Sequence, residues 1–529
     1  MQRIIIIFLL LTVAFSGSKA QVTFSTDFES GSLGDYQLVD STWLKVSDKD
    51  SILCLSYLIT SKSDPINPID TDLEPSARWF FFRMTGIEGK QITLNFKKTD
   101  PLRPVYSYNK VDYHRFDNMA DTDYLFTQRF KEDTVYVAYF IPYDYSRLQE
   151  RIGDWDSHAY VQLDTIGYSR KGLPLQMLTI TDTSVSDSQK KRVWVHGRVH
   201  TSETPGTWHL DGFISALVAD TPQAEAYRQA MTFYIVPFAN PDGVVEGLSR
   251  SNPTGVNIEI NWARPEEQTE PEVKALKAIM EKLTADRPFD MLLNMHSQVE
   301  NSATYYVHSA SSTSDYIYKN QLKLCHLTMF YKPYLGKNDL TFSDIAERYV
   351  EGWMWNRTGD KTLSITFETP YTYYNKKSDL WVTSESLRNF GAISLTAVGD
   401  YFGISSPDRI YVSNRNAKAK SGWEKIDYLP KESTLYPDIM LLDDMLIRAK
   451  KEGSKISYKI DKLPPGTYKI YRWIPGSITN HKNPDNNLWN PVAYHTQKKT
   501  GKFEFKMEAT AADELFDALL LCTFASPNF

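Results

Sequence analysis

The sequence is poor in cysteine, in charge of one sign and in catalytic motifs of the common hydrolase classes. Its three cysteines, Cys54, Cys325 and Cys522, lie far apart, so neither a disulfide framework nor a cysteine zinc site is expected. The 59 basic and 65 acidic side chains leave a net charge of −6, so nucleic acid is not expected as a partner. The chain has no His-Glu-x-x-His, no Gly-x-Ser-x-Gly and no Walker-type phosphate loop, which argues against a serine hydrolase or a nucleotide enzyme.

Long apolar runs are also scarce, and the one that stands out lies at the N-terminus. Arg3 precedes the run from Ile4 to Phe15, and small residues follow it up to Ala20. The run is shorter than the roughly 20 residues of a membrane span. We therefore predict a secretory signal peptide cut after Ala20, and a secreted or periplasmic protein without stable membrane insertion.

The chain of 529 residues is too long for a single hydrophobic core. Short apolar segments separated by turn residues predict β structure first, then strands alternate with helical segments, and the pattern becomes strand-like again near the end. We predict a signal peptide over 1–20, an N-terminal β-sandwich-like domain over 21–150, an α/β domain with a mixed sheet and flanking helices over 151–405, and a small C-terminal β domain over 406–529.

Polar side chains with metal-binding capacity follow three expected strands of the α/β part. His200 and Glu203 lie between the strand at 193–195 and a helix that we expect to begin near Pro205 with Thr204 as its N-cap. His296 follows the strand at 291–293, and Glu368 follows the strand at 363–367. Since ligands bind outside the carboxyl ends of strands in open α/β sheets, these residues predict a site there.

The chemistry of this set is that of a catalytic zinc site. Two imidazoles and one carboxylate, from His200, His296 and Glu203, leave a fourth position for water. Glu368, from a third strand end, can then act as the base.

The motifs that carry these residues resemble those of a known family. They are GRVHTSET at 197–204, VPFANPDGV at 236–244, NMHS at 294–297 and ITFE at 365–368. They are similar to the zinc metallocarboxypeptidases of the carboxypeptidase A type, with the cytosolic carboxypeptidases, which carry an N-terminal β domain, as the nearest branch. ARWFFFR at 77–83 and VAYFIPYDY at 137–145 extend the resemblance over about 24–403.

The resemblance implies a role for each residue of the site. One Zn²⁺ is bound by His200, Glu203 and His296, Glu368 activates the attacking water, and Arg250 polarises the scissile carbonyl. A zinc ion makes water acidic enough for a carboxylate to take its proton at neutral pH. A guanidinium near the carbonyl oxygen stabilises its developing negative charge.

One stretch departs from the family pattern. Where the family shows Gly-x-Asp-Leu-Asn-Arg-x-Trp, residues 255–262 read GVNIEINW, so Asn257 replaces the Asp that supports a zinc histidine. Glu259 and Ile260 replace the Asn-Arg pair that grips the terminal carboxylate of the substrate. Asn257 can still accept a hydrogen bond from a histidine, whereas the carboxylate clamp is lost.

We therefore predict an exported zinc metallocarboxypeptidase that hydrolyses peptide or peptide-like amides with altered recognition of the substrate terminus. Glu259 would then accept a basic group of the substrate; alternatively, Glu259 pairs with a cation such as Arg264 and another arginine holds the carboxylate. Two other functions stay open. One is an amidohydrolase acting on a cell-wall or other non-standard amide, and the other is a zinc-binding recognition protein that has lost catalysis.

Overall fold

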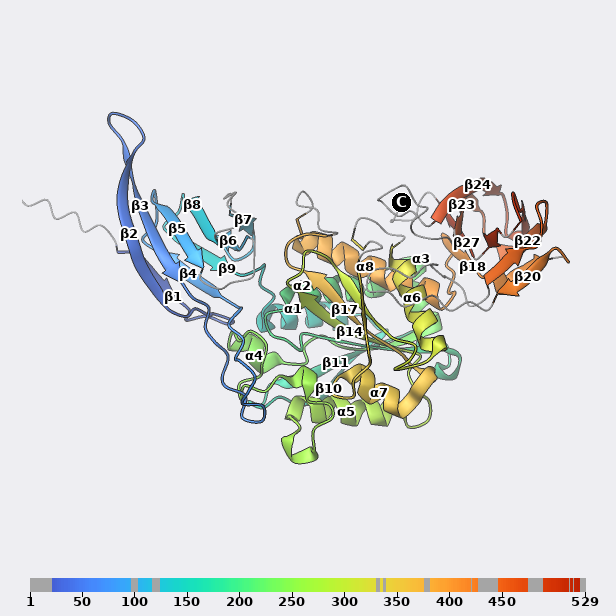
Figure 1. The fold of residues 1–529 in the computed structure, drawn as a ribbon, viewed down its shortest axis with the longest axis horizontal. Coiled ribbons are helices and arrows are strands. Elements are labelled where there is room, and N and C mark those ends of the chain that lie inside the picture. The colour runs from blue at the N-terminus through green and yellow to red at the C-terminus, as the bar shows by residue number, and fades with distance from the viewer. Residues whose placement is uncertain are drawn as a thin grey trace, which may run out of the picture.

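The computed structural model describes residues 21–96, 103–116, 124–329, 334–335, 339–374, 381–419, 421–426, 446–473, 489–512, 514–516 and 518–523. Figure 1 shows an α/β unit in the centre, with β sheets from the N-terminal part of the chain on one side and β sheets from the C-terminal part on the other. Over the described residues, no helix combines the length and the apolar character that crossing a membrane requires. The three cysteines are all unpaired.

The N-terminal part forms two sheets whose side chains interleave in a shared aromatic core. Alternate residues of the strand β5 (Gln91–Phe96) are buried, and the ring of Phe96 stacks on that of Phe80 with centroids 4.3 Å apart. The five-stranded sheet has the order β1 (Thr23–Ser25), β4 (Phe81–Thr85), β9 (Thr134–Ala138), β6 (Val105–Ser107) and β7 (His114–Arg115). The four-stranded sheet has the order β2 (Tyr36–Lys45), β3 (Ser51–Ile59), β5 (Gln91–Phe96) and β8 (Leu125–Arg129).

The central unit contains one eight-stranded mixed sheet, in which four neighbouring strands run parallel. Its order is β10 (Val161–Tyr168), β11 (Pro174–Ile180), β13 (Met231–Val236), β12 (Lys191–Gly197), β14 (Met291–Gln298), β17 (Leu363–Pro370), β15 (Thr304–His308) and β16 (Leu340–Ser343). The parallel strands β13, β12, β14 and β17 are almost entirely buried because helices cover both faces of the sheet.

Two hydrophobic cores lie on opposite faces of this sheet. On β12, Val193 and Val195 join one core and Trp194 joins the other, as the alternation of side chains along a strand requires. The first core is covered by α1 (Tyr145–Asp156), α2 (Thr204–Val218), α3 (Pro222–Ala230), α6 (Asp315–Met329) and α8 (Ser384–Tyr401). The second is covered by α5 (Pro271–Thr284) and α7 (Val350–Thr358), as Figure 1 shows. The short helix α4 (Pro241–Val245) and the 3-10 turns η1 (Asp187–Gln189), η2 (Ile258–Ile260), η3 (Glu266–Gln268) and η4 (Gly359–Lys361) lie in the connections.

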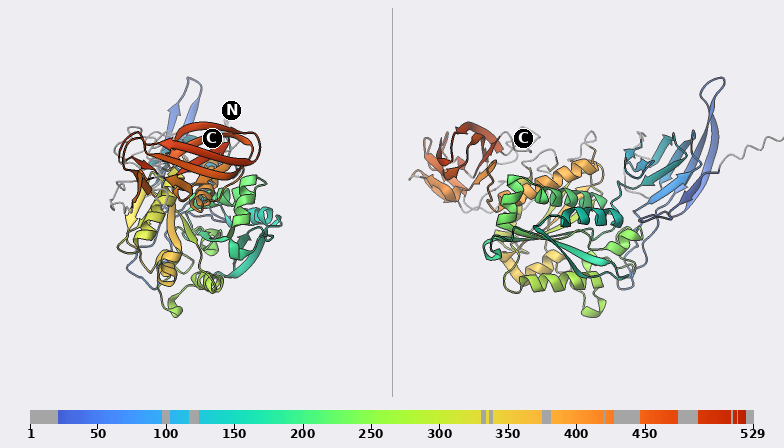
Figure 2. Two further views of the ribbon diagram at one scale, coloured as in Figure 1. Left: turned by 90° about the vertical axis from the view of Figure 1, so that its right-hand side faces the viewer. Right: turned by 180° about the vertical axis from the view of Figure 1, so that it is seen from behind.

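The C-terminal part forms three small sheets around a separate core. The first sheet has the order β18 (Arg409–Val412), β27 (Leu519–Thr523), β23 (Gly466–Trp473) and β24 (Trp489–Gln497). The second has the order β19 (Ala417–Ala419), β22 (Lys455–Leu463) and β25 (Gly501–Glu508). The third has the order β20 (Trp423–Ile426), β21 (Leu446–Ala449) and β26 (Leu515–Phe516), and the turn η5 (Asn414–Asn416) lies between β18 and β19. A buried ion pair between Arg409 of β18 and Asp400 of α8 joins this part to the central unit, which Figure 2 shows from two further sides.

This architecture confirms the predicted α/β class, with a mixed sheet and additional β sheets before and after it. The boundaries that we set at residues 150 and 405 stay a prediction. The predicted signal peptide, over 1–20, lies outside the described residues.

Glycines let α2 and α8 pack against each other at backbone distance, and this contact can be tested. A Cβ at Gly391 would lie 1.9 Å from the carbonyl oxygen of His209. Because backbone atoms cannot yield, we expect Gly391→Ala to lower the free energy of unfolding by about 3 kcal/mol or more. Chemical denaturation measures this change.

The matched control is Gly153→Ala on α1, where an added Cβ meets no atom within 4 Å. This change should be neutral or stabilising by about 0.5–1 kcal/mol. If both variants unfold like the wild type, the two helices are not packed as closely as described.

Candidate metal and catalytic site

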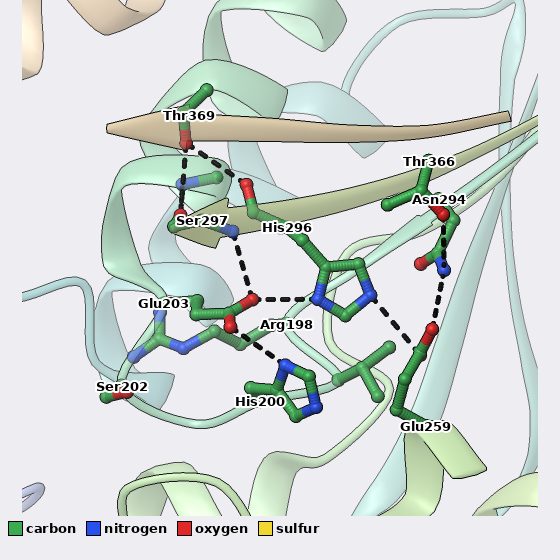
Figure 3. Close-up of polar contacts among 12 residues, drawn as sticks. Arg198, His200, Ser202, Glu203, Glu259, Asn294, His296, Ser297, Thr366 and Thr369 are labelled. Carbon is green, nitrogen blue, oxygen red and sulfur yellow. Dashed lines mark hydrogen bonds and ion pairs between the residues drawn. The ribbon is translucent and has the colours of Figure 1, made fainter. Parts of the chain in front are cut away.

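Three side chains from two neighbouring segments meet at the carboxyl end of the parallel strands. His200 and Glu203 lie in the loop between β12 and α2, and His296 lies on β14, which is hydrogen-bonded to β12. Their candidate ligand atoms all lie within 4.8 Å of one another, and all three residues are buried. The structure therefore brings together the three predicted ligands (Figure 3).

The Glu203 carboxylate lies between the two histidines. Its Oε1 is 2.8 Å from Nδ1 of His200, and its Oε2 is 2.8 Å from Nδ1 of His296. The same Oε2 accepts a hydrogen bond from the backbone N–H of Ser297 at 3.0 Å. Glu203, rather than Thr204 as we predicted, is the N-cap residue of α2; its carboxylate does not bond to the first turn because it is directed at the two imidazoles.

The loop that carries His200 and Glu203 is held by Arg198. This residue adopts a positive φ of 52°, which turns the chain away from β12. Its buried guanidinium donates hydrogen bonds to the carbonyl oxygen of Thr201 at 2.8 Å, to that of Tyr143 at 3.0 Å and to the hydroxyl of Thr207 at 3.0 Å. The backbone of α2 can approach His296 because Gly206 has no Cβ, which would lie 2.8 Å from the His296 carbonyl oxygen.

Each histidine has a polar partner on its outer nitrogen. Nε2 of His200 lies 3.2 Å from Oδ1 of Asn257, and Nε2 of His296 lies 3.2 Å from Oε2 of Glu259. Outer acceptors of this kind orient a metal-binding imidazole and leave Nδ1 for the metal. Asn257 therefore lies beside His200, and its support of a zinc histidine stays a prediction.

The two histidines differ in their electrostatic surroundings. Burial, followed by the nearby charge of Arg250, lowers the pKa of His200 to about 3. Burial acts in the same direction on His296, but the charges of Glu259 and Glu203 outweigh it and hold the pKa of His296 well above its usual value. The two carboxylates thus place negative charge around His296, which favours a cation at this position.

Glu368 lies beside the three ligands on the next strand. It pairs in register with His296 across the parallel strands β14 and β17. Its Oε2 is buried and has no hydrogen-bond partner among the described residues. Burial, followed by the charge of Glu203, raises the pKa of Glu368 to about 8. A carboxyl group in this setting suits proton transfer near neutral pH.

Arg250 is half-buried in the loop after α4, close enough for its charge to act on His200 and Glu368. Its backbone N–H donates to Oδ2 of Asp64, from the N-terminal part of the chain, at 2.8 Å. The structure therefore brings Arg250 to the same site as the three ligands and Glu368.

The two residues at the clamp positions lie apart from each other. Glu259 is buried against His296 and accepts a hydrogen bond from Nδ2 of Asn294 at 3.0 Å. Ile260 instead lines a cavity of about 500 Å³ that Arg264 and Arg348 also line. Because the Glu259 carboxylate is engaged at the histidine, its placement does not favour our prediction that it accepts a basic group of the substrate.

We also predicted, as the alternative, an ion pair between Glu259 and Arg264. Both residues are described by the structure, and they form no ion pair with each other. Arg264 forms its ion pair with Asp70 from the N-terminal part of the chain.

A buried polar chain behind His296 was missed by the sequence analysis. Asn294 donates through one nitrogen, Nδ2, to Glu259 and to Oε1 of Glu351, at 3.0 Å each, and Thr366 donates to the same Glu351 oxygen. Asn294 precedes His296 by two residues on one strand, a spacing that could have indicated a shared face. Glu351 lies in α7 and gave no local signal.

The donor set fits zinc. Two imidazole nitrogens and a carboxylate are the ligands that Zn²⁺ takes in catalytic sites. The outer nitrogen of His200 lies against an amide oxygen, and that of His296 lies against a carboxylate.

Comparisons with known proteins agree with this geometry. Residues 156–396 match the zinc carboxypeptidase family. Cytosolic carboxypeptidase 6 from Mus musculus is 25% identical over 473 residues, which cover 81% of this chain and 83% of that protein. The human protein of the same name is 26% identical over 334 residues, covering 56% of this chain and 62% of that protein.

A solved structure has the same fold. The metallo-carboxypeptidase from Burkholderia cenocepacia matches with a TM-score of 0.58 at 21% identity, covering 72% of this chain and 99% of that one. Residues 156–396 are therefore a zinc carboxypeptidase domain, and the protein is a zinc metallopeptidase. The predicted family, enzyme class and zinc cofactor are confirmed.

The same relatives contradict the predicted location. They are named cytosolic carboxypeptidases, which points to a cytosolic rather than a secreted protein. Our prediction of a secreted or periplasmic location is therefore wrong; it depended on the apolar run before Ala20 alone.

We expect the purified protein to bind about one zinc ion per chain, and His296→Ala to abolish this binding because it removes one of three ligands. Glu259→Gln, which removes the charge next to His296, should weaken zinc binding by about 10- to 100-fold. Competition with a chromophoric chelator measures both affinities.

His114→Ala is the control, because this exposed histidine lies on β7 and outside the site. Wild-type zinc affinity in His296→Ala would show that the ligand set is wrong. Unchanged affinity in Glu259→Gln would show that Glu259 does not support His296.

Proposed function

We propose that this protein hydrolyses peptide amide bonds with Glu368 as the base and Arg250 as the electrophilic group, at a zinc ion held by His200, Glu203 and His296. One observation carries the proposal: the ligand cluster lies beside Oε2 of Glu368 at the carboxyl end of β14 and β17, and this oxygen has no hydrogen-bond partner in the described part of the chain. When bound, zinc supplies Lewis acidity, which polarises a carbonyl and lowers the pKa of water.

Glu368 holds the proton during the reaction. Its free carboxylate oxygen takes a proton from the attacking water and delivers it to the departing amine. Burial raises the pKa of Glu368, which favours uptake of the proton by this carboxylate.

Arg250 stabilises negative charge on the carbonyl oxygen. Because the backbone that carries it is fixed, this guanidinium needs less reorganisation when the charge develops. The residue before Arg250 contacts the metal-binding loop, where the carbonyl oxygen of Ser249 accepts the N–H of Ser202 at 2.9 Å, and this supports a position of Arg250 near the reacting carbonyl.

We further propose that the protein recognises the substrate terminus differently from carboxypeptidases that have the Asn-Arg pair. Ile260 offers no donor to a carboxylate, and Glu259 is engaged by His296 and Asn294. A fork of donors is therefore missing from these two positions. Arg348 lines the same cavity as Ile260, and over the described part of the chain it has no acidic partner, so it is the alternative cation for a substrate carboxylate.

Replacement of the base tests the first proposal. Glu368→Gln should keep the fold and the zinc but lower kcat by about 10²- to 10⁴-fold, because an amide cannot take the proton. Steady-state kinetics on the best peptide found for the wild type, together with metal analysis, measure this loss. Activity within about threefold of wild type would rule out Glu368 as the base.

A comparison of substrate termini tests the second proposal. We compare an N-acylated peptide that ends in a free carboxylate with the same peptide ending in an amide. We expect the two kcat/KM values of the wild type to differ by less than about tenfold, because a charged carboxylate clamp, which would produce a larger difference, is missing. Ile260→Arg should raise the preference for the free carboxylate, and Ile260→Met, which adds no donor, is the matched control.

A wild-type preference above about a hundredfold for the free carboxylate would contradict altered recognition. Arg348→Gln then tells whether that guanidinium holds the carboxylate.

A further inference from the structure

A single buried aspartate from the N-terminal part of the chain binds the loop that carries Arg250. Asp64 lies between β3 and β4 and is 5% exposed. Its Oδ1 accepts the backbone N–H of Ser249 at 2.7 Å, and its Oδ2 accepts those of Arg250 at 2.8 Å and Ser251 at 2.9 Å. Three consecutive N–H groups thus converge on one carboxylate.

Ser249 is held from two further sides. Its hydroxyl oxygen accepts hydrogen bonds from the backbone N–H groups of Arg78 and Trp79, at 2.9 Å each. Its carbonyl oxygen accepts the N–H of Ser202 at 2.9 Å, and Ser202 lies between the ligands His200 and Glu203. The loop therefore connects the N-terminal part of the chain directly to the loop that binds the metal.

The far end of the loop is fixed by the central unit. Nδ2 of Asn240 donates to the carbonyl oxygen of Ser251 at 3.1 Å and to that of Val199 at 3.2 Å. With Asp64 on one side and Asn240 on the other, the backbone at residue 250 has little freedom to shift.

A carboxylate is suited to this contact in a way that an amide is not. Both of its oxygens accept, whereas asparagine offers one oxygen and would direct an N–H₂ group at a backbone N–H. Loss of one acceptor leaves a buried N–H without a partner and allows the loop to move. A displacement of about 1 Å at a catalytic group can cost about 10²-fold in rate.

From this geometry we infer that Asp64 is a positioning residue for Arg250, so that the N-terminal β part completes the active site rather than only lying against it. The inference rests on the proposed role of Arg250. It assigns to Asp64 an effect on the transition state that is transmitted through the backbone of residues 249–251.

A double-mutant cycle with Asp64→Asn and Arg250→Gln tests this inference on the peptide that the wild type cleaves best. Asp64→Asn should lower kcat by about 10²-fold and change KM by less than about threefold, with zinc content unchanged. In the Arg250→Gln background, the same change should alter kcat by less than about threefold, because the group that it positions is gone.

Ser30→Ala is the matched control for weakened contact between the two parts of the chain. The buried Ser30 hydroxyl donates to the carbonyl oxygen of Val244 at 2.7 Å, and among the described residues it forms no hydrogen bond with residues 249–251. Its loss should lower stability and leave kcat near that of the wild type. Asp64→Glu keeps both carboxylate oxygens but moves them by one methylene, and it replaces Asp64→Asn in the cycle if that variant does not fold. We expect Asp64→Glu to lower kcat by about tenfold, and we expect this loss to vanish in the Arg250→Gln background.

The possible outcomes distinguish the positioning role of Asp64 from the proposed catalytic role of Arg250. If Arg250→Gln lowers kcat but neither Asp64 variant does, the positioning inference is overturned and the role of Arg250 stands. If an Asp64 variant lowers kcat equally in both backgrounds, Asp64 does not act through Arg250. If Arg250→Gln leaves kcat unchanged, the proposed role of Arg250 fails first.

Discussion

The contact of one carboxylate, Glu203, with two histidines organises the centre of this protein. Glu203 lies in the loop after β12 and His296 lies on β14, so their contact requires α2 to begin close to the end of β14. Gly206 permits that approach, and Arg198 turns the chain into the loop that makes it possible. The metal site thus depends on backbone features that are not ligands.

Around this centre, the charge distribution is uneven. His200 has a neutral amide on its outer nitrogen, whereas His296 has a carboxylate, and that carboxylate continues through Asn294 to Glu351. A charged acceptor makes an imidazole a stronger ligand than a neutral one does. In this chain the charged support therefore lies at His296, while the position that the family pattern gives to aspartate carries Asn257 beside His200.

The N-terminal β part and the zinc carboxypeptidase domain meet at the loop that carries Arg250. Asp64 and the backbone of residues 78–79 hold this loop from one side, and the metal-binding loop contacts it from the other. The C-terminal sheets join the domain elsewhere, through Arg409 and Asp400 at the end of α8. The N-terminal β part therefore contacts a loop of the candidate active site, whereas the C-terminal β part contacts the domain at the end of α8.

The sequence by itself predicted the class of fold, the candidate metal ligands and the neighbourhood of Glu368. Each of these follows from short-range patterns, since polar residues that end neighbouring parallel strands meet at one edge of the sheet whatever the connections between them. The family resemblance also predicted that Asn257 contacts a histidine of the site, and Asn257 lies 3.2 Å from His200 in the structure.

Only the tertiary structure decided where Glu259 points, because a residue in a 3-10 turn can face the substrate or the metal with no change in local pattern. The same holds for Glu351 and Asp64, which reach the site from 57 and 186 residues away along the chain, counted from Asn294 and Arg250. Contacts at such separations depend on how whole elements pack, and no spacing within the sequence encodes them.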